Sequence, residues 1–194
     1  ITNGIHIPTW THEPFKALFD KYAELWHKDP KYLRKAEIIP CEEIWEAHMQ
    51  CKRSLFDEIY RLTSRKWDPE ILTIGFARRA AAYKRATLLF KDLDRLISIA
   101  EKSPGMQIVF SGKSHPQDVE GKRNIKLIHD YKKTIENRTD KLKLLYLPNY
   151  NMRLGYLITA GVDLWMNTPL RPHEASGTSG MKSVVNGVLN FSIL

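Results

Sequence analysis

The side chains best suited to bind an anion follow a short apolar run of the sequence. Arg78 and Arg79 come directly after the run 71–76, and Lys84 lies five residues beyond Arg79. Guanidinium and ammonium groups bind phosphate well, and backbone N–H groups at a helix start add to such a site. We therefore expect Arg79 and Lys84 to converge on an anion.

A second stretch able to do chemistry covers residues 174–182. It begins with Glu174, ends with Lys182, and contains between them the small residues Ala175, Ser176, Gly177, Thr178, Ser179 and Gly180. Small residues at the entry to a helix let the backbone approach an oxyanion closely. Lys182 falls in the first turns of that helix, so its ammonium can face the same pocket. An aromatic side chain, Tyr150, follows another apolar run and joins this set.

Secondary-structure elements must bring these residues together. Apolar runs at 71–76, 106–110, 142–147, 162–166 and 188–194 predict five strands. Apolar residues at spacings of three and four predict helices at 86–100, 117–138 and 176–187, with a short helix ending at 161. Alternating strands and helices form right-handed βαβ units and a parallel sheet. The sequence thus predicts an α/β fold, a Rossmann-like doubly wound sheet whose ligands bind beyond the carboxyl ends of the strands.

The first third of the chain has a different character. Residues 14–66 have a helical pattern with breaks at Asp29-Pro30 and at Pro40, and the apolar stripe within 41–65 indicates core packing. We predict two parts, a helical segment at 1–66 and a sheet lobe at 67–194. The chain has no initiator Met, shows no signal peptide and stops within an apolar run, so we expect a piece of a longer protein.

Composition narrows the class of protein. Hydrophobic residues make up 43% and charged residues 27% of the 194 residues, which is ordinary globular usage. No apolar run approaches the roughly 20 residues that a membrane span needs. The net charge of +8 suits nucleic acid, an anionic membrane or a phosphate-bearing ligand. Lys and Arg are dispersed, and in the dense stretch 118–143 they alternate with acids, which argues against nucleic acid.

Several other site classes are disfavoured by the motifs. No G-x-G-x-x-G follows a predicted strand and no G-x-x-x-x-G-K-[ST] is present, so dinucleotide and P-loop sites are poor interpretations. Cys41 and Cys51 lie ten residues apart in one predicted helix, which is not a same-face spacing. There is no C-x-x-C and no cluster with metal-ligand spacing, so we expect no metal and two ordinary thiols in a reducing cytoplasm.

Together these runs match one family along the whole chain. Residues 174–182 resemble the pyridoxal-phosphate attachment segment of the α-glucan (glycogen, starch and maltodextrin) phosphorylases. Residues 75–85 resemble their phosphate-site segment, and residues 1–6, 110–116 and 149–152 match in the same order. The resemblance best suits the short bacterial and archaeal type. It implies a two-lobed GT-B architecture, of which this chain forms most of the second lobe.

The resemblance also implies roles for individual residues. Lys182 matches the lysine that holds pyridoxal 5′-phosphate as a Schiff base, while Arg79 and Lys84 match the residues that clamp the substrate phosphate. The remaining cofactor-binding positions are Arg78, Tyr150, Thr178 and Gly180. The positions that bind the glucosyl unit are Glu174, Ala175, Ser176, Gly177 and Asn3.

The implied activity is that of an α-1,4-glucan phosphorylase, a hexosyltransferase. It moves a glucosyl unit from the non-reducing end of a glycogen, starch or maltodextrin chain to inorganic phosphate, giving α-D-glucose 1-phosphate, with the cofactor's 5′-phosphate as proton shuttle. We expect a cytoplasmic enzyme without nucleic-acid or membrane partners, and leave a homo-oligomer open. Because the active site lies between two lobes, these 194 residues alone should be inactive.

Two other functions stay open at this stage. A nucleotide-sugar glycosyltransferase of the GT-B type, similar to glycogen or starch synthase, has two glutamates eight positions apart at this loop. Here Glu174 is followed eight positions later by Lys182, which suits an aldehyde cofactor instead. The other alternative is a non-catalytic glucan-binding remnant.

Overall fold

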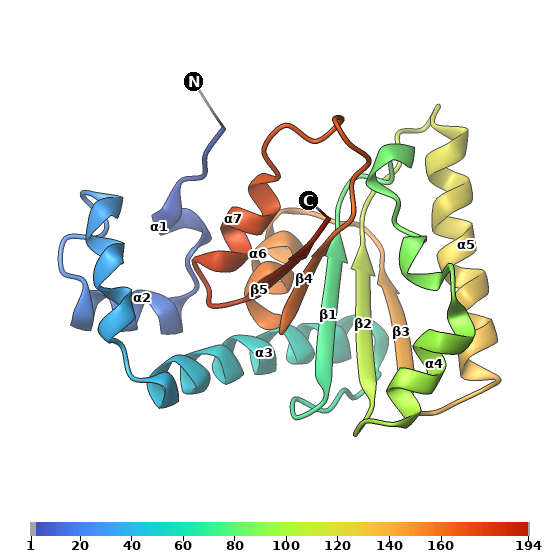
Figure 1. Cartoon of the computed structure of the whole chain (residues 1–194), viewed down its shortest axis with the longest axis horizontal. Coiled ribbons are helices and arrows are strands. Elements are labelled where there is room, and N and C mark those ends of the chain that lie inside the picture. The colour runs from blue at the N-terminus through green and yellow to red at the C-terminus, as the bar shows by residue number, and fades with distance from the viewer. Residues whose placement is uncertain (1–2, 194) are drawn as a thin grey trace.

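The sheet is the centre of the molecule. A computed structural model describes residues 3–193 and shows five parallel strands between layers of helices (Figure 1). Strands β1 (Leu72–Ala77), β2 (Met106–Ser111), β3 (Leu142–Leu147), β4 (Leu164–Asn167) and β5 (Leu189–Ser192) lie in the order β3-β2-β1-β4-β5. The order reverses between β1 and β4, as in a doubly wound sheet. The predicted Rossmann-like α/β fold is confirmed.

Strand registers align the carboxyl ends of the central strands. Leu72 pairs with Met106 and Ala77 with Ser111 between β1 and β2, and the same register continues into β3. On the other side of β1, Ile74 pairs with Leu164 of β4. The segments that follow β1 and β4 therefore leave the sheet side by side at one edge.

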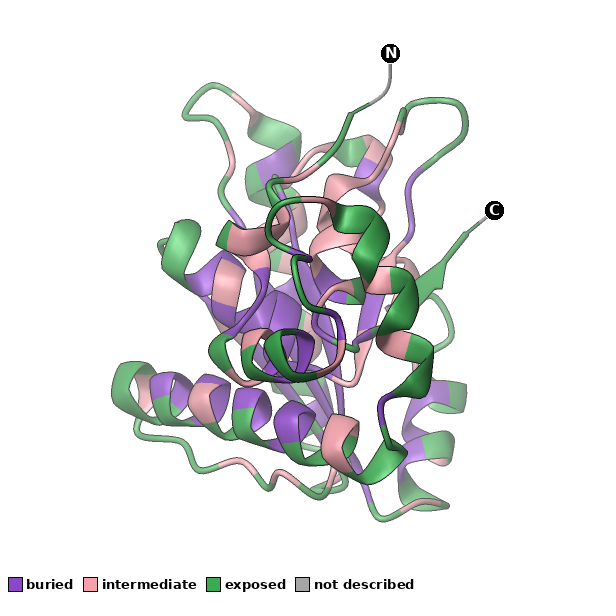
Figure 2. Ribbon diagram, turned by 90° about the vertical axis from the view of Figure 1, so that its left-hand side faces the viewer, coloured by how far each residue is buried: buried purple, intermediate pink, exposed green. Residues whose placement is uncertain are grey.

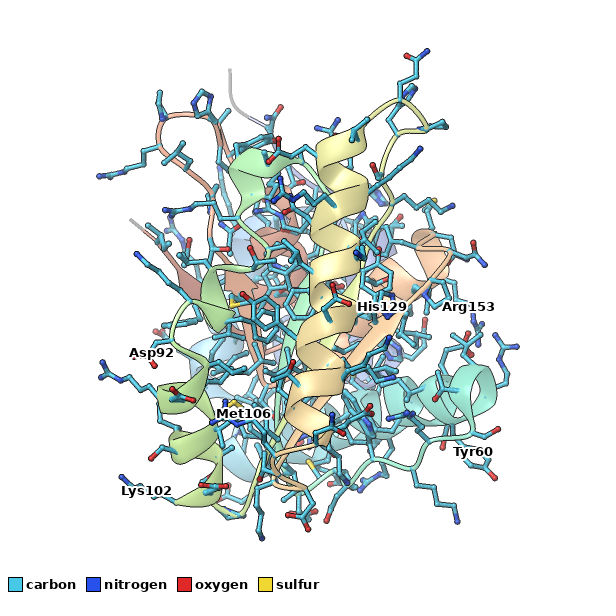
Figure 3. All side chains as sticks on the ribbon, turned by 90° about the vertical axis from the view of Figure 1, so that its right-hand side faces the viewer. Tyr60, Asp92, Lys102, Met106, His129 and Arg153 are labelled. Atoms are coloured by element: carbon cyan, nitrogen blue, oxygen red, sulfur yellow. The ribbon has the colours of Figure 1, made fainter. Side chains whose placement is uncertain are left out.

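Helices cover both faces of the sheet. The helices α4 (Leu93–Glu101) and α5 (Val119–Glu136) pack on one face, where even-numbered strand residues such as Ile108 and Phe110 are buried. Figure 3 shows this side, with α5 in front of the sheet and α4 beside it, between the labelled Asp92 and Lys102. On the opposite face, α3 (Cys41–Thr63) and α6 (Met152–Gly161) bury odd-numbered strand residues such as Val109 and Trp165. The alternation follows from the two-residue period of a strand.

One glycine sets how closely α6 approaches the sheet. A Cβ on Gly75 of β1 would lie 2.9 Å from a methyl carbon of Val162 and 3.2 Å from one of Ile158. Both neighbours are fully buried. The missing side chain lets the end of α6 pack directly against the backbone of β1, because contacts this short do not occur between real Cβ and methyl carbons.

The N-terminal helices form a second core on the outer side of α3. Helices α1 (Ile7–Trp10), α2 (Glu13–Tyr22), the 3₁₀ segment η1 (Pro30–Ile38) and α3 follow one another, with the predicted breaks at Asp29-Pro30 and Pro40. Buried members of this core are Phe15, Phe19, Trp26, Ala47, Cys51 and Ala160. Ala160 belongs to α6, so this core adjoins the sheet layers. Figure 2 shows buried residues gathered on the strands and on the inward sides of the helices.

Two expected helices are wrong in extent. The helix predicted at 86–100 begins only at Leu93, and the segment before it contains the short 3₁₀ turns η2 (Ala82–Lys84) and η3 (Leu88–Phe90). Arg85 interrupts it in the left-handed region (φ 49°), and its guanidinium donates to the carbonyl oxygens of Thr168 (2.9 Å) and Pro169 (3.0 Å). These long-range hydrogen bonds outweigh the local helical pattern.

The last predicted helix is also shorter than expected. It was predicted at 176–187, and the observed α7 covers Thr178–Val184. Gly177 before it (φ 65°) and Gly187 beyond it (φ 69°) both lie in the left-handed region, where helices begin or end. Residues Ile1, Thr2 and Leu194, which belong to the predicted first motif and last strand, lie outside the described residues.

Candidate anion and cofactor site

Two buried cations meet at the point where the strand order reverses. Arg78 directly follows β1, and Lys84 ends η2; they are 9% and 6% exposed. Arg78 donates through Nη2 to Oε2 of Glu174 at 2.9 Å, and Lys84 Nζ donates to the same oxygen. Glu174 lies in the long loop after β4, which rises above the carboxyl ends of the strands in Figure 1. Three charged groups distant in sequence thus share one site.

The charges of this cluster support one another. Burial raises the pKa of Glu174, but the hydrogen bond from Lys84 and the charge of Arg78 outweigh it and leave the pKa below its ordinary value. Burial lowers the pKa of Arg78, and the nearby carboxylate of Glu174 opposes that effect. The cluster therefore has two cations and one anion at neutral pH, an excess of one positive charge.

Asn167, the last residue of β4, connects this cluster to two neighbouring hollows. Its Oδ1 accepts a hydrogen bond from Nη1 of Arg78. A hollow of about 210 Å³ lies between Asn167 and Glu174, and a larger one of about 620 Å³ extends past Gly4, Gly180 and Met181. Ser176 and Gly177 line both hollows. The Oγ of Ser176 is buried without a hydrogen-bond partner, so it is available to a polar ligand.

Lys182 lies on α7, and its ammonium rests on an aromatic ring. The Nζ atom is 3.5 Å from the centre of the Trp10 ring. Burial lowers the pKa of Lys182 below its ordinary value. A lysine of lowered pKa has a larger fraction of neutral amine at pH 7, which is the form that attacks an aldehyde.

Tyr150 approaches the cluster from the loop between β3 and α6. Burial raises the pKa of its phenol, and the charge of Arg78 opposes that effect. The ring packs against the core that contains Leu154 and Leu157 of α6. Tyr150 therefore presents a fixed aromatic surface beside Arg78.

The structure brings some of the predicted site residues together and leaves others apart. Arg78, Lys84 and Glu174 meet directly, whereas Arg79, Ala175 and Asn3 are exposed. The expectation that Arg79 pairs with Lys84 is wrong for this conformation, because the strand alternation turns Arg78 inward and Arg79 out. Thr178 begins α7, one side of the larger hollow. Lys182 contacts Trp10, and no contact joins it to Glu174 among residues 3–193.

Sequence reasoning missed three residues of this region. Asn167 ends a strand, so the rule that ligands bind at carboxyl ends was a signal that could have identified it. Trp10 and Asn186 gave no such signal, because their importance depends on a contact between the two ends of the chain. Within residues 3–193, no group of three or more His, Cys, Asp or Glu side chains is arranged to hold a metal ion. No helix in that range is both long and apolar enough to cross a membrane.

Comparison with known proteins agrees with this geometry. The family model described as carbohydrate phosphorylase matches residues 1–194. The chain belongs to the carbohydrate phosphorylase family. It is 41% identical to the maltodextrin phosphorylase of Thermococcus litoralis and 37% identical to the glycogen phosphorylase of Aquifex aeolicus, in each case over 100% of this chain. The glycogen phosphorylase of Mycobacterium tuberculosis is 35% identical over the same range.

The matches extend over only part of each relative. This phosphorylase chain covers 25% of the Thermococcus protein, 31% of the Aquifex protein and 24% of the Mycobacterium protein. It therefore spans about a quarter to a third of the length of these curated relatives. Like them, it is a glycosyltransferase-family sequence with a Rossmann-like sheet.

Proposed function

We propose that this chain is the phosphate- and cofactor-binding lobe of an α-1,4-glucan phosphorylase with GT-B architecture. The reaction transfers a glucosyl unit from the non-reducing end of the glucan to inorganic phosphate and gives α-D-glucose 1-phosphate. The observation that supports it most directly is the convergence of Arg78 and Lys84 on one carboxylate oxygen of Glu174. A buried pair of cations that already holds one oxyanion is suited to hold a phosphate oxygen.

The cations solve an electrostatic problem of this reaction. A substrate phosphate next to the phosphate of a cofactor experiences strong repulsion: at an effective dielectric constant of about 20, two unit charges 4 Å apart interact by about 4 kcal/mol. Arg78 and Lys84 offset that repulsion from inside the protein, where both are largely shielded from water. Arg79, exposed in this conformation, is proposed to join them when the substrate phosphate is bound.

The residues present fit pyridoxal phosphate. Lys182 offers an amine whose pKa is lowered by burial, Tyr150 offers a fixed ring surface, and Arg78 offers a charge for the 5′-phosphate. Thr178 and Gly180 are proposed to bind the same phosphate through the hydroxyl and backbone N–H groups. When bound, the cofactor supplies a phosphate group that exchanges a proton with the substrate phosphate.

The sugar is proposed to bind along the loop after β4. Ser176 contributes a buried hydroxyl without a partner, and Gly177 leaves its backbone accessible at the border of both hollows. Glu174 and Ala175 precede them, and Asn3 adjoins Gly4, which lines the larger hollow. Glu174 has a second task in this proposal: it occupies the cations until phosphate arrives and is then free to accept hydrogen bonds from sugar hydroxyls.

Borohydride trapping tests the proposal on the protein at its natural length. Cofactor-free protein is incubated with pyridoxal phosphate, reduced with borohydride and digested, and peptides are identified by mass. A pyridoxyl label on Lys182, absent from Lys182→Arg protein, is the expected result, together with phosphate-dependent release of glucose 1-phosphate from maltodextrin. No label on Lys182 in folded protein would refute the cofactor role.

The same preparation separates the alternatives. Glucosyl transfer from a nucleotide sugar without a pyridoxyl label would instead identify a nucleotide-sugar glycosyltransferase. Glucan binding without either reaction would identify a binding remnant. The chain of residues 1–194 alone is proposed to be inactive, because the glucan must be bound from the opposite side of the site. A cytoplasmic location is proposed with the function.

A further inference from the structure

The side chain of Asn186 joins the two ends of the chain beneath Lys182. Asn186 follows α7 and is 0% exposed. Its Nδ2 donates to the carbonyl oxygens of Trp10 and Lys182, each at 2.8 Å, and its Oδ1 accepts from the backbone N–H of His12 at 2.6 Å. Both N–H groups and the oxygen of one amide are thus used on three backbone atoms.

This arrangement fixes the surroundings of the Lys182 amine. One bond of Asn186 holds the turn of α7 that contains Lys182, and the other two hold the backbone on both sides of Thr11. Because Trp10 is held there, its ring lies beneath the ammonium, 3.5 Å from Nζ. An amide that is fully buried and fully bonded loses several hydrogen bonds at once if either segment shifts, so the two segments move as one unit.

The neighbouring side chains keep this region dry and free of competing charge. The imidazole of His12 stacks on the ring of Tyr156, with centroids 4.5 Å apart. Burial lowers the pKa of His12, although Glu13 opposes the effect, and the Nδ1 atom of His12 is buried without a partner. Burial likewise lowers the pKa of Lys182. Whatever keeps Trp10 and α7 together therefore also keeps water from the amine.

We propose that Asn186 is a positioning residue for Lys182, which holds the Trp10–His12 segment against α7 so that the amine is presented neutral and in one orientation to an aldehyde ligand. This rests on the proposed function only in what the amine does, not in how it is held. Asn186 touches no ligand in this arrangement. Its effect is transmitted through the backbone of Lys182 and the ring of Trp10.

Amine labelling of the cofactor-free protein at its natural length tests the proposal without any enzyme assay. The protein is pulsed with an acylating reagent over a range of pH, and acylation of each lysine is read from peptide masses. Exposed lysines such as Lys91 and Lys102 provide the internal reference. In the wild type, Lys182 should react with a midpoint below that of the reference lysines.

The Asn186→Ala variant should move the Lys182 midpoint upward, toward the reference lysines. Each unit of upward shift lowers the neutral fraction at pH 7 about tenfold, so the rate of pyridoxal phosphate uptake should fall by a similar factor. Ser183→Ala is the matched control, because Ser183 is also fully buried in α7 but its hydroxyl bonds only to Ser179 of the same helix. It should leave the midpoint unchanged.

An unchanged midpoint in Asn186→Ala, or an equal shift in Ser183→Ala, would overturn the proposal. If Asn186→Ala does not fold, Asn186→Ser, which keeps one donor, is measured with the same two readings. Loss of borohydride trapping on wild-type Lys182 would refute the cofactor role instead. The midpoint in the cofactor-free protein would still decide whether Asn186 positions the amine.

Discussion

Asp163 attaches helix α3 to the sheet, and its replacement is a sharp test of the energetics described above. Oδ2 of Asp163 accepts from Lys52 Nζ at 2.7 Å and from the Thr73 N–H at 2.6 Å, while Oδ1 lies 2.7 Å from Nε2 of His48. Lys52 is 1% exposed. In Asp163→Asn this buried ammonium retains the carbonyl oxygen of Ile71, at 2.9 Å, but has no counter-charge.

The expected cost follows from the burial of the pair. The side chains of Lys52 and Asp163 are 2% and 16% exposed, so water screens their interaction little. Removing one partner of a buried ion pair costs about 3–5 kcal/mol. Since 1.4 kcal/mol is a factor of ten, the amide of Thr73 should exchange its hydrogen about a hundred to several thousand times faster.

Hydrogen exchange measured by mass spectrometry on peptides from the start of β1 and the middle of α3 provides the assay. Asp57→Asn is the matched control, because Asp57 is an exposed carboxylate on the same helix and its loss should change exchange by less than about 0.5 kcal/mol. The double variant Lys52→Met with Asp163→Asn should recover much of the loss, since it also removes the buried charge. An acceleration below about fivefold in Asp163→Asn, or no recovery in the double variant, would refute the reasoning.

The same carboxylate gives a prediction for pH. Burial raises the pKa of Asp163, but hydrogen bonds from His48 and Lys52 outweigh it, so the pKa in the folded protein lies below its ordinary value. A group of this kind stabilises the fold fully above its unfolded pKa of about 3.9, and the contribution is lost as the pH falls through the lowered folded pKa. The wild type should therefore lose protection at the start of β1 below about pH 4. The Asp163→Asn variant should lack that step.

Three further perturbations have defined outcomes. Gly75→Ala places a Cβ 2.9 Å from Val162 and should cost about 1–3 kcal/mol, seen as a lower thermal midpoint; an unchanged midpoint would contradict the packing argument. Burial raises the pKa of Cys51 to about 12 while Cys41 is exposed, so a thiol reagent at about pH 8 should label Cys41 alone, and equal labelling rates would contradict this. Glu174→Gln removes the anion held by the buried cations and should raise phosphate affinity by about tenfold in calorimetry, whereas weaker binding would show that the carboxylate does not compete.

The order and type of the main elements could be predicted because local pattern determines them. The strand predicted at 142–147 is β3 (Leu142–Leu147), and the helix predicted at 41–65 is α3 (Cys41–Thr63). Both have a strong apolar period and clear boundaries at proline or turn residues, which act on the chain without distant contacts. The free state of both cysteines was likewise predicted from their spacing and is confirmed.

The prediction at 86–100 failed where distant contacts determine the backbone. The hydrogen bonds from Arg85 to the loop after β4 convert the expected first turns of a helix into short 3₁₀ segments. No local pattern could show this, because the acceptors lie more than eighty residues away in the sequence. The same segment contains Lys84, so the departure from helix also determines where that cation lies.

The sequence by itself determined which chemical groups this protein has and at which strand ends they stand: the cations after β1, and the carboxylate, small residues and lysine after β4. It also determined the family, because these groups recur in a specific order along the chain. Only the tertiary structure decided that Arg78, and not Arg79, pairs with Lys84, and that Asn186 and Trp10 surround Lys182. The physical reason is that burial and hydrogen-bond partners depend on the packing of segments far apart in sequence, which sequence spacing does not report.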